Sequence, residues 1–306
     1  MPAVFNGSEA YPDPPIAPVL TIGNFDGLHI GHRHLIQRLV ASARERRAPA
    51  VVYTFDPPPR AVLGTKPAPR IQSWDDKVEI MGELGVDHVV VETFTRAFAE
   101  RPPAWFLEEV VGARIKPQAM VVGYDFRFGK GREGDVHTLR EAFPDLPVTQ
   151  VEPLKLAGQN VSSTRIRSLI LAGQVADAAH LLGCSHRIRG VVVGGDARGR
   201  TIGFPTANLQ TTAELAPAVG VYAVRSRVGG GPWSSAVANL GHRPTFDGRG
   251  FLIEVHILDF EGDLYGRMLE VEFVERIRGE RSFASADELV AQINADITIA
   301  RRTLQS

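Results

Sequence analysis

The pattern of hydrophobic and polar positions changes part-way along the chain, near residue 183. Before that point, short apolar runs rich in β-branched residues alternate with stretches in which apolar residues recur at helical spacing. This alternation predicts an α/β architecture, in which helices cover both faces of a parallel sheet. The predicted strands are Val19–Ile22, Ala50–Phe55, His88–Val91, Ala119–Gly123 and Val148–Val151.

Helices are expected between these strands, over residues 32–47 and 73–84 among others. The second of them begins with Ser73, three residues before Asp76, and stops at Gly85, which are residue types typical of helix ends. Open parallel sheets bind ligands beyond the carboxyl ends of their strands, so the chemistry of this half is expected in the loops there. These loops follow Ile22, Phe55, Gly123 and Val151.

After a predicted helix over residues 164–182, strands follow one another without intervening helices. Clusters of Gly, Pro and Asp separate them, which indicates an antiparallel barrel or sandwich. A final helix is expected after the capping box that begins at Ser285. The predicted strands are Arg187–Val193, Val221–Arg227, Ser235–Asn239, Leu252–Leu258 and Met268–Val274.

Composition narrows the class of protein. The chain has 306 residues, enough for about two domains. Its 34 Lys and Arg residues nearly balance 35 Asp and Glu residues. It therefore lacks the excess of basic residues that is typical of proteins that bind nucleic acid or an anionic membrane, and neither partner is expected. With one cysteine, no secretion-type start and no apolar run of about 18 residues, the chain is expected to be a cytoplasmic enzyme. No pattern indicates an oligomeric state.

The first candidate site is the segment GNFDGLHIGH, residues 23–32, between a predicted strand and a predicted helix. Its glycines allow a tight turn and a close approach of the backbone to a ligand, and the free N–H groups of a helix start favour phosphate. His29 and His32, at i and i+3, can face the same side and donate hydrogen bonds to phosphate oxygens. The proposed phosphate-binding residues of this loop are Gly23, Asn24, Phe25, Asp26 and Gly27.

A second candidate is the start of the helix beyond the last strand of the α/β half. Ser163, Thr164, Arg165 and Arg167 combine hydroxyls, guanidinium groups and free backbone N–H groups, which suits a triphosphate clamp. Taken alone, the segment is equally well explained as an ordinary N-cap. Its pairing with the two histidines favours the clamp.

The loop after the strand 119–123 faces the same edge of the sheet. Asp125, Phe126 and Phe128 are suited to shape a pocket for a nucleotide base or another ring there. Residues 129–134 match GxGxxG formally, but they follow the fourth predicted strand instead of the first, so a dehydrogenase is rejected. No GxxxxGK[ST] occurs, so phosphoryl transfer here does not use a P-loop.

The candidate site of the second half is GRTIGFPTAN, residues 199–208. Thr206 and Asn208 offer oxygen ligands on one side of an extended segment, which suits Mg²⁺ that shares its other positions with waters and phosphates. A plain turn that leads into a strand is the alternative. Glu254 shares a strand face with His256 and is either a solvated carboxylate or a general base, and spacing alone does not choose between them.

Six segments, in order, resemble the prokaryotic bifunctional riboflavin kinase/FMN adenylyltransferase (FAD synthetase) family over nearly the whole chain. They are GNFDGLHIGH (23–32), VVGYDFRFG (121–129), SSTRIR (162–167), GRTIGFPTAN (199–208), NLGHRPTF (239–246) and EVHILDF (254–260). The resemblance implies a Rossmann-like nucleotidyltransferase domain at 1–183 that adenylylates FMN to FAD and releases pyrophosphate. It also implies a β-barrel domain with a C-terminal helix at 184–306 that phosphorylates riboflavin with ATP and Mg²⁺.

The same resemblance implies roles for the candidate residues. The two histidines stabilise the ATP phosphates, and the segment Ser163–Arg167 holds the triphosphate. Thr206 and Asn208 serve the magnesium and nucleotide site, and Glu254 is the base for the ribityl hydroxyl. The residues that would bind ATP in the kinase are Gly199, Arg200, Gly203 and Pro205.

Two departures from the family pattern bear on the rate of adenylylation. Asn160 stands where some relatives carry a basic residue, and the loop FDPPP (55–59) lacks a histidine that relatives often have. Two other functions stay open at this point: a nucleotidyltransferase with a different phosphate acceptor, and a barrel that binds flavin as a regulatory module.

Overall fold

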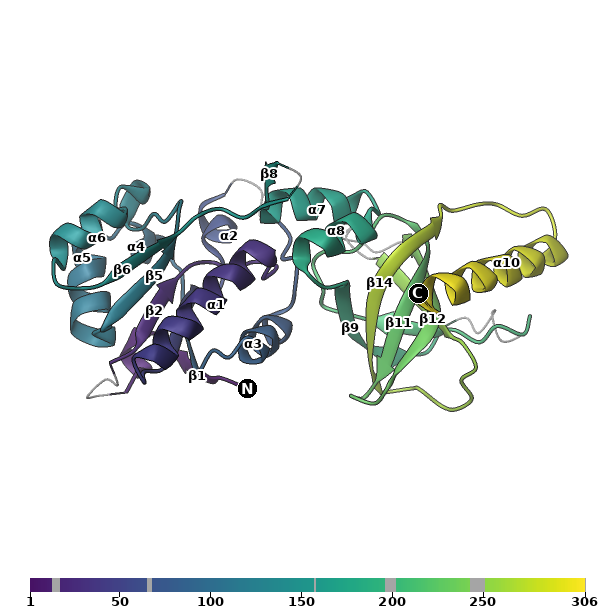
Figure 1. Ribbon diagram of the computed structural model, residues 1–306. Helices are drawn as coiled ribbons and strands as arrows, with labels where there is room; N and C mark the ends of the chain where they lie inside the picture. Colours follow the sequence, from purple (N-terminus) through teal and green to yellow (C-terminus); the bar gives the residue numbers. More distant parts are fainter. Residues whose placement is uncertain (13–16, 65–67, 157, 196–201, 243–250, 306) are drawn as a thin grey trace. The chain divides into compact units, whose positions relative to one another are not determined.

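The computed structural model describes residues 1–12, 17–64, 68–156, 158–195, 202–242 and 251–305. The chain forms two compact units (Figure 1): residues 1–69 with 73–162, and residues 70–72 with 163–306. The domain limits 1–183 and 184–306 stay a prediction from the sequence.

The first unit is built on a six-stranded sheet in which every neighbouring pair is parallel, in the order β1-β4-β3-β2-β5-β6. The five predicted strands are confirmed, and β1 is an addition. The strands are β1 (Ala3–Asn6), β2 (Val19–Ile22), β3 (Ala50–Phe55), β4 (His88–Glu92), β5 (Ala119–Gly123) and β6 (Val148–Val151).

Helices cover both faces of this sheet, as the pattern predicts (Figure 1). Val19 packs with α1 and α3 on one face, and the next residue, Leu20, packs with the π-helix η2 and α6 on the other. This is the alternation expected of strands that are buried on both sides. The longer helical elements are α1 (Ile30–Glu45), α3 (Trp74–Glu83), η2 (Phe106–Ile115) and α6 (Val136–Ala142). The short ones are η1 (Ser8–Ala10), α2 (Pro59–Leu63), α4 (Arg96–Ala99), α5 (Pro103–Trp105) and η3 (Lys130–Arg132).

The edge strand β1 has only three consecutive apolar residues, most of them exposed, and a run this short does not by itself predict a strand. Its neighbourhood is held by a carboxylate. Glu92 Oε2 accepts hydrogen bonds from the Tyr53 hydroxyl at 2.6 Å and from both the backbone N–H and the hydroxyl of Ser8 at 3.1 Å. These bonds fasten the chain after β1 to the carboxyl ends of β3 and β4.

The strand order changes direction at β2. From β2 the chain adds β3 and then β4 on one side, and then crosses to add β5 on the other, so β2 and β5 flank a topological switch point. The ladder between β2 and β5 covers only two residue pairs, whereas that between β2 and β3 covers four. The carboxyl ends of β2 and β5 therefore diverge, which is where open α/β sheets bind ligands.

The second unit contains a closed antiparallel barrel in the order β10-β13-β12-β11-β14-β9. The predicted helix over 164–182 is two helices, separated at Gly173, whose φ of +76° ends α7. The helices are α7 (Ser163–Leu171), α8 (Val175–Leu182) and α10 (Ala286–Gln305). The strands are β9 (His186–Val193), β10 (Ala207–Gln210), β11 (Gly220–Val228), β12 (Trp233–His242), β13 (Phe251–Ile257) and β14 (Met268–Arg278).

The barrel interior is apolar, and α10 lies against its outer surface (Figure 1). On β13, Ile253, Val255 and Ile257 are buried inside the barrel, so Glu254 and His256 belong to the outer face. A short hairpin, β7 (Lys155–Leu156) with β8 (Gln159–Asn160), precedes α7. Within the described residues, every helix is too short or too polar to span a membrane.

Candidate functional sites

The loop between β2 and α1 has a strained backbone. Phe25, Gly27 and Leu28 have φ values of +49°, +86° and +39°, a region that non-glycine residues enter at a cost of about 1–3 kcal/mol each. Phe25 and Leu28 are buried in the core below, so packing holds the loop in this shape. A fixed, strained loop beyond a strand at a switch point is typical of a functional site.

His29 and His32 lie together at the start of α1. His29 is the N-cap, and its Nδ1 accepts a hydrogen bond from the backbone N–H of His32 at 3.3 Å. The two rings are stacked, with centroids 3.6 Å apart and planes 15° apart. The helix starts at Ile30, two residues earlier than predicted, because the His29 side chain caps it.

Burial keeps this pair of imidazoles neutral. Desolvation lowers the pKa of His29 to about 4, against a smaller opposite effect of Asp26 and Asp125. It also lowers the pKa of His32 well below its usual range, and the nearby His29 and Lys77 act in the same direction. Because His29 Nδ1 accepts a bond, its proton is on Nε2. Within the described residues, His32 Nδ1 is buried without a hydrogen-bond partner, so a ligand can satisfy it.

The loop after β5 reaches the same place, because Asp125 is close enough to act on the pKa of His29. In this loop Phe126 stacks on Phe128 at 5.3 Å, and Phe128 is buried against Phe106. Phe126 is only half-buried. The loop therefore supplies one supporting ring and one more accessible ring.

The GxGxxG segment 129–134 has a structural explanation. Phe128 and Gly134 form an isolated β-bridge, and a Cβ on Gly134 would lie 2.7 Å from the Phe128 ring. A Cβ on Gly129 would lie 2.7 Å from Pro103. These glycines allow close packing in a folded loop, in agreement with the rejection of a dinucleotide fingerprint.

The residues of the predicted triphosphate clamp lie on the first turns of α7, in the second unit. Ser163 and Arg165 are half-buried, Thr164 is exposed and Arg167 is buried. The structure thus brings together His29, His32 and Asp125 within the first unit, and the joint action of α7 with them stays a prediction.

In the barrel, three polar residues form a row on the outer face. Asn208 of β10 pairs with Glu254 of β13, which pairs in turn with Asn239 of β12. Asn239 Nδ2 donates a hydrogen bond to Glu254 Oε2 at 3.3 Å. The backbone at Gly195 comes so close to Asn208 that an added Cβ would overlap its side chain.

A pocket of about 660 Å³ opens over this row, between the barrel and α10. Its volume is in the usual range for a small-molecule site. Glu254 and Asn239 line one side, and Phe283 and Ile297 line another. The bidentate pair of Arg278 with Asp296, at 2.8–3.1 Å, fixes α10 to β14 at this wall.

A smaller cavity, of about 80 Å³, lies on the other side of the segment 204–207. It is lined by Pro205, Phe260 and Tyr265 among others, and Thr206 lines both this cavity and the larger pocket. His256 Nδ1 donates a hydrogen bond to the carbonyl of Pro205 at 2.8 Å, which holds this dividing segment. Gly203 forms a turn with φ of +89°, whereas Gly199 and Arg200 lie outside the described residues.

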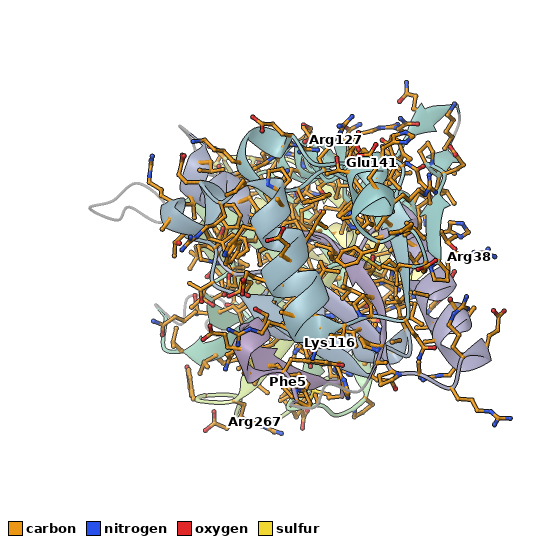
Figure 2. All side chains as sticks on the ribbon, turned by 90° about the vertical axis from the view of Figure 1, so that its left-hand side faces the viewer. Phe5, Arg38, Lys116, Arg127, Glu141 and Arg267 are labelled. Carbon is orange, nitrogen blue, oxygen red and sulfur yellow. The ribbon has the colours of Figure 1, made fainter. Side chains whose placement is uncertain are left out.

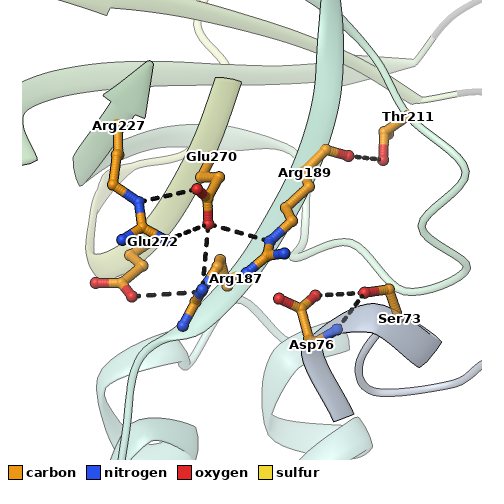
Figure 3. Close-up of polar contacts among 8 residues, drawn as sticks. All are labelled: Ser73, Asp76, Arg187, Arg189, Thr211, Arg227, Glu270 and Glu272. Atoms are coloured by element: carbon orange, nitrogen blue, oxygen red, sulfur yellow. Dashed lines mark hydrogen bonds and ion pairs between the residues drawn. The ribbon is translucent and has the colours of Figure 1, made fainter. Parts of the chain in front are cut away.

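Another charged cluster of the barrel is structural. Figure 3 shows the carboxylate of Glu270 on β14 joined to Arg187, Arg189 and Arg227 at 2.8–3.1 Å. Desolvation alone would raise the pKa of Glu270, but these guanidinium groups together bring it below its usual value. The cluster ties β9, β11 and β14 together on the outer surface of the barrel.

Comparisons with known proteins give a separate match for each of two successive parts of the chain. Residues 13–165 match a family model described as FAD synthetase, and residues 182–304 match one described as riboflavin kinase. The chain is 42% identical over 286 residues to the bifunctional riboflavin kinase/FMN adenylyltransferase of Escherichia coli (strain K12), covering 92% of this chain and 91% of the relative. The corresponding protein of Bacillus subtilis (strain 168) is 36% identical, with 91% and 90% covered.

The chain belongs to the bifunctional riboflavin kinase/FMN adenylyltransferase family. It is an enzyme that phosphorylates riboflavin to FMN and adenylylates FMN to FAD with ATP. The family resemblance drawn from the six sequence motifs is thereby confirmed. The different-acceptor and regulatory-module alternatives lose their support, since both family models match.

Among solved structures, a crystal structure described as a macrolide-efflux protein from Streptococcus pneumoniae superimposes with a TM-score of 0.90 and 33% identity. The match covers 97% of this chain and 98% of the chain from Streptococcus pneumoniae. The fold is therefore shared over nearly the whole length of both chains.

Several residues at the sites of this family member were not predicted. The sequence places Asn239 at the end of a predicted strand and in the NLGHRPTF segment without a role, although its register opposite Glu254 makes it a neighbour of the carboxylate. Asp296 and Arg278 lie far apart in the sequence, and only the docking of α10 brings them together. Lys77 reads as an ordinary charged residue of a surface helix, but its side chain is buried.

Proposed function

We propose that FMN is adenylylated at the carboxyl ends of β2 and β5, and that riboflavin is phosphorylated on the outer face of the barrel, where Glu254 lies. The observation that carries the second assignment is the position of Thr206, which lines two cavities at once. A phosphoryl donor and its acceptor must meet at one point, and Thr206 marks such a point.

In the barrel, the larger pocket suits the flavin because it combines apolar and aromatic walls with a few polar groups, among them Glu254 on the strand face. Glu254 accepts the proton of the ribityl hydroxyl as the oxygen attacks the γ-phosphorus of ATP, and ADP leaves. The smaller cavity, with its aromatic lining, receives part of the ATP. Gly203 and Pro205, together with Gly199 and Arg200, would shape the loop around the ATP phosphates.

Thr206 and Asn208 fit a magnesium site that is shared with ATP. The hydroxyl of Thr206 is exposed and the amide of Asn208 is half-buried at the pocket. Mg²⁺ takes oxygen ligands and keeps waters and substrate phosphates among them, so the two neutral oxygens of this pair would leave the ATP phosphates to supply the negative charge. No cluster of three His, Cys, Asp or Glu side chains occurs among the residues described, so ATP would complete the set. When bound, the ion neutralises phosphate charge.

At the carboxyl ends of β2 and β5, the FMN phosphate is the nucleophile. It is already an anion at neutral pH, so it attacks the α-phosphorus of ATP without a general base, and pyrophosphate leaves. The loop Gly23–Gly27, the N-terminus of α1 and the two neutral imidazoles donate hydrogen bonds to the phosphates. Ser163, Thr164, Arg165 and Arg167 supply further contacts to the triphosphate, and Asp125, Phe126 and Phe128 border the flavin or the base.

Separate assays of the two half-reactions test both assignments in one protein. His29→Ala should lower FAD formation from FMN by about 10²–10³-fold, the usual cost of losing one charge-stabilising donor, and leave FMN formation intact. Glu254→Gln should lower FMN formation from riboflavin by about 10²–10⁴-fold and leave FAD formation from supplied FMN intact. Loss of both activities in a folded variant would contradict two separate sites.

A further inference from the structure

Lys77 is a buried lysine whose side chain reaches the loop between β2 and α1. It projects from the first turns of α3, and only 7% of it is exposed. Its Nζ donates a hydrogen bond to the backbone carbonyl of Asn24 at 2.7 Å and another to Oγ1 of Thr54 at 2.9 Å. The Trp74 ring covers the ammonium group at 5.5 Å.

Such a group is costly to bury, so its contacts matter. Asn24 begins the loop in which Phe25, Gly27 and Leu28 adopt left-handed conformations. The Thr54 hydroxyl lies 3.4 Å from the same Asn24 carbonyl, so β3, α3 and the loop meet at this point. The lysine thus fastens the start of a strained loop to the neighbouring strand.

The same ammonium lies close enough to act on the histidine pair, since it is one of the groups that lower the pKa of His32. Asp26 and Asp125 act in the opposite sense on His29. The histidine pair is therefore subject to opposite electrostatic effects, from one cation of α3 and from two carboxylates of the β2 and β5 loops.

We propose that Lys77 is a positioning residue for adenylyl transfer, which holds the Asn24–Leu28 loop in its ligand-binding shape and sets a fixed positive charge beneath it. This inference rests on the proposed adenylylation site. The ammonium acts through the Asn24 carbonyl and the electrostatics of the histidine pair, and it leaves contact with the phosphates to the loop, α1 and the imidazoles.

The test compares three substitutions in the full chain. Lys77→Met removes both the charge and the donor at similar side-chain length, Lys77→Gln keeps a donor without charge, and Lys77→Arg keeps both. We expect kcat for FAD formation to fall roughly 10–100-fold in Lys77→Met, because a small displacement of a catalytic loop costs about that much. Lys77→Gln should be intermediate, and Lys77→Arg should recover most of the activity.

Lys116→Met is the matched control. Lys116 is exposed and precedes the amino end of β5, away from the carboxyl ends where the proposed site lies. In Figure 2, Lys116 is in the lower part of the view, and Arg127, which follows the carboxyl end of β5, is in the upper part. This control should leave FAD formation unchanged. Riboflavin phosphorylation by the barrel should stay unchanged in every variant, because both lysines belong to the first unit.

Titration of the imidazole resonances by NMR separates this role from a merely structural one. Removal of the Lys77 charge should move the apparent titration of the histidine pair to higher pH, and Lys77→Arg should not. A folded Lys77→Met protein with unchanged titration and kcat within twofold of wild type would overturn the proposal. Should Lys77→Met fail to fold, equal kcat values for Lys77→Gln and Lys77→Arg would overturn it instead. If His29→Ala retains FAD formation, the site assignment itself fails.

Discussion

The two units use ATP with opposite arrangements of ionisable groups. Beyond the carboxyl end of β2, burial keeps His29 and His32 neutral. The hydrogen-bond donors there are the imidazoles themselves and backbone N–H groups. On the barrel, the central group is a half-buried carboxylate, Glu254, which receives a hydrogen bond from Asn239 and faces a large pocket. The proposed adenylylation site is thus made of donors, and the proposed phosphorylation site is organised around an acceptor of protons.

The acceptor substrate explains the difference. FMN brings a phosphate that is already ionised, so its site needs only positioning and charge stabilisation. Riboflavin brings a neutral hydroxyl, which must lose a proton as it attacks, so its site needs a base. The common co-substrate therefore does not dictate the residues of a site, whereas the protonation state of the nucleophile does.

A low histidine pKa alone does not mark a catalytic site, because a buried histidine of the barrel core has one too. The largest effect that we expect is therefore on the stability of the barrel at acid pH. His186 on β9 is buried beside Phe273, and desolvation lowers its pKa to about 4. Its folded pKa is below the unfolded value of about 6.5. This stabilisation is therefore complete above pH 6.5 and is lost as the pH falls towards 4, by up to roughly 3 kcal/mol.

Hydrogen exchange of barrel peptides measures this stability in the full chain. His186→Gln should flatten the pH dependence between pH 6.5 and 4, whereas His180→Gln, at an exposed histidine of the same unit, should leave it unchanged. An equally steep acid loss in His186→Gln would show that His186 is not the group responsible.

The next largest effect concerns magnesium at the barrel site. Thr206→Val keeps the shape of the side chain and removes its hydroxyl. We expect the Mg²⁺ concentration that half-saturates FMN formation to rise at least about 10–100-fold, the range for losing a residue that supports a metal ligand, and that for FAD formation to stay constant. Thr298→Val, on the exposed side of α10, is the matched control. An equal rise in both half-reactions would contradict a metal site confined to the barrel.

The sequence predicts the elements with strong periodicity and misses those that depend on tertiary contacts. Five parallel strands and five barrel strands show their apolar runs directly. The apolar run of the four-residue β1 is too short to predict a strand. Backbone pairing with β4 and the Glu92 contacts of the chain after it hold β1 in place. The break at Gly173 divides one predicted helix into two, although a lone glycine in a helical pattern does not by itself indicate a break.

The candidate sites show the same limit. Local motifs indicate His29, His32 and the PTAN segment, because each is contiguous along the chain. Lys77, Asn239 and Asp296 come from other elements, and only burial or strand register shows that they belong to the sites. A sequence motif thus identifies the residues that face a ligand more readily than those that support them.

The smallest expected effect tests whether Glu254 depends on its neighbour. Asn239→Ala removes the hydrogen bond to Glu254 Oε2, whose length of 3.3 Å and partly exposed surroundings make it a moderate interaction. We expect kcat for FMN formation to fall about tenfold, with FAD formation from FMN unchanged. Ser235→Ala, on the same outward row of β12, should change neither. A tenfold rise in KM for riboflavin at constant kcat would instead assign Asn239 to flavin binding, and the contrast between a donor site and a base site would then rest on Glu254 alone.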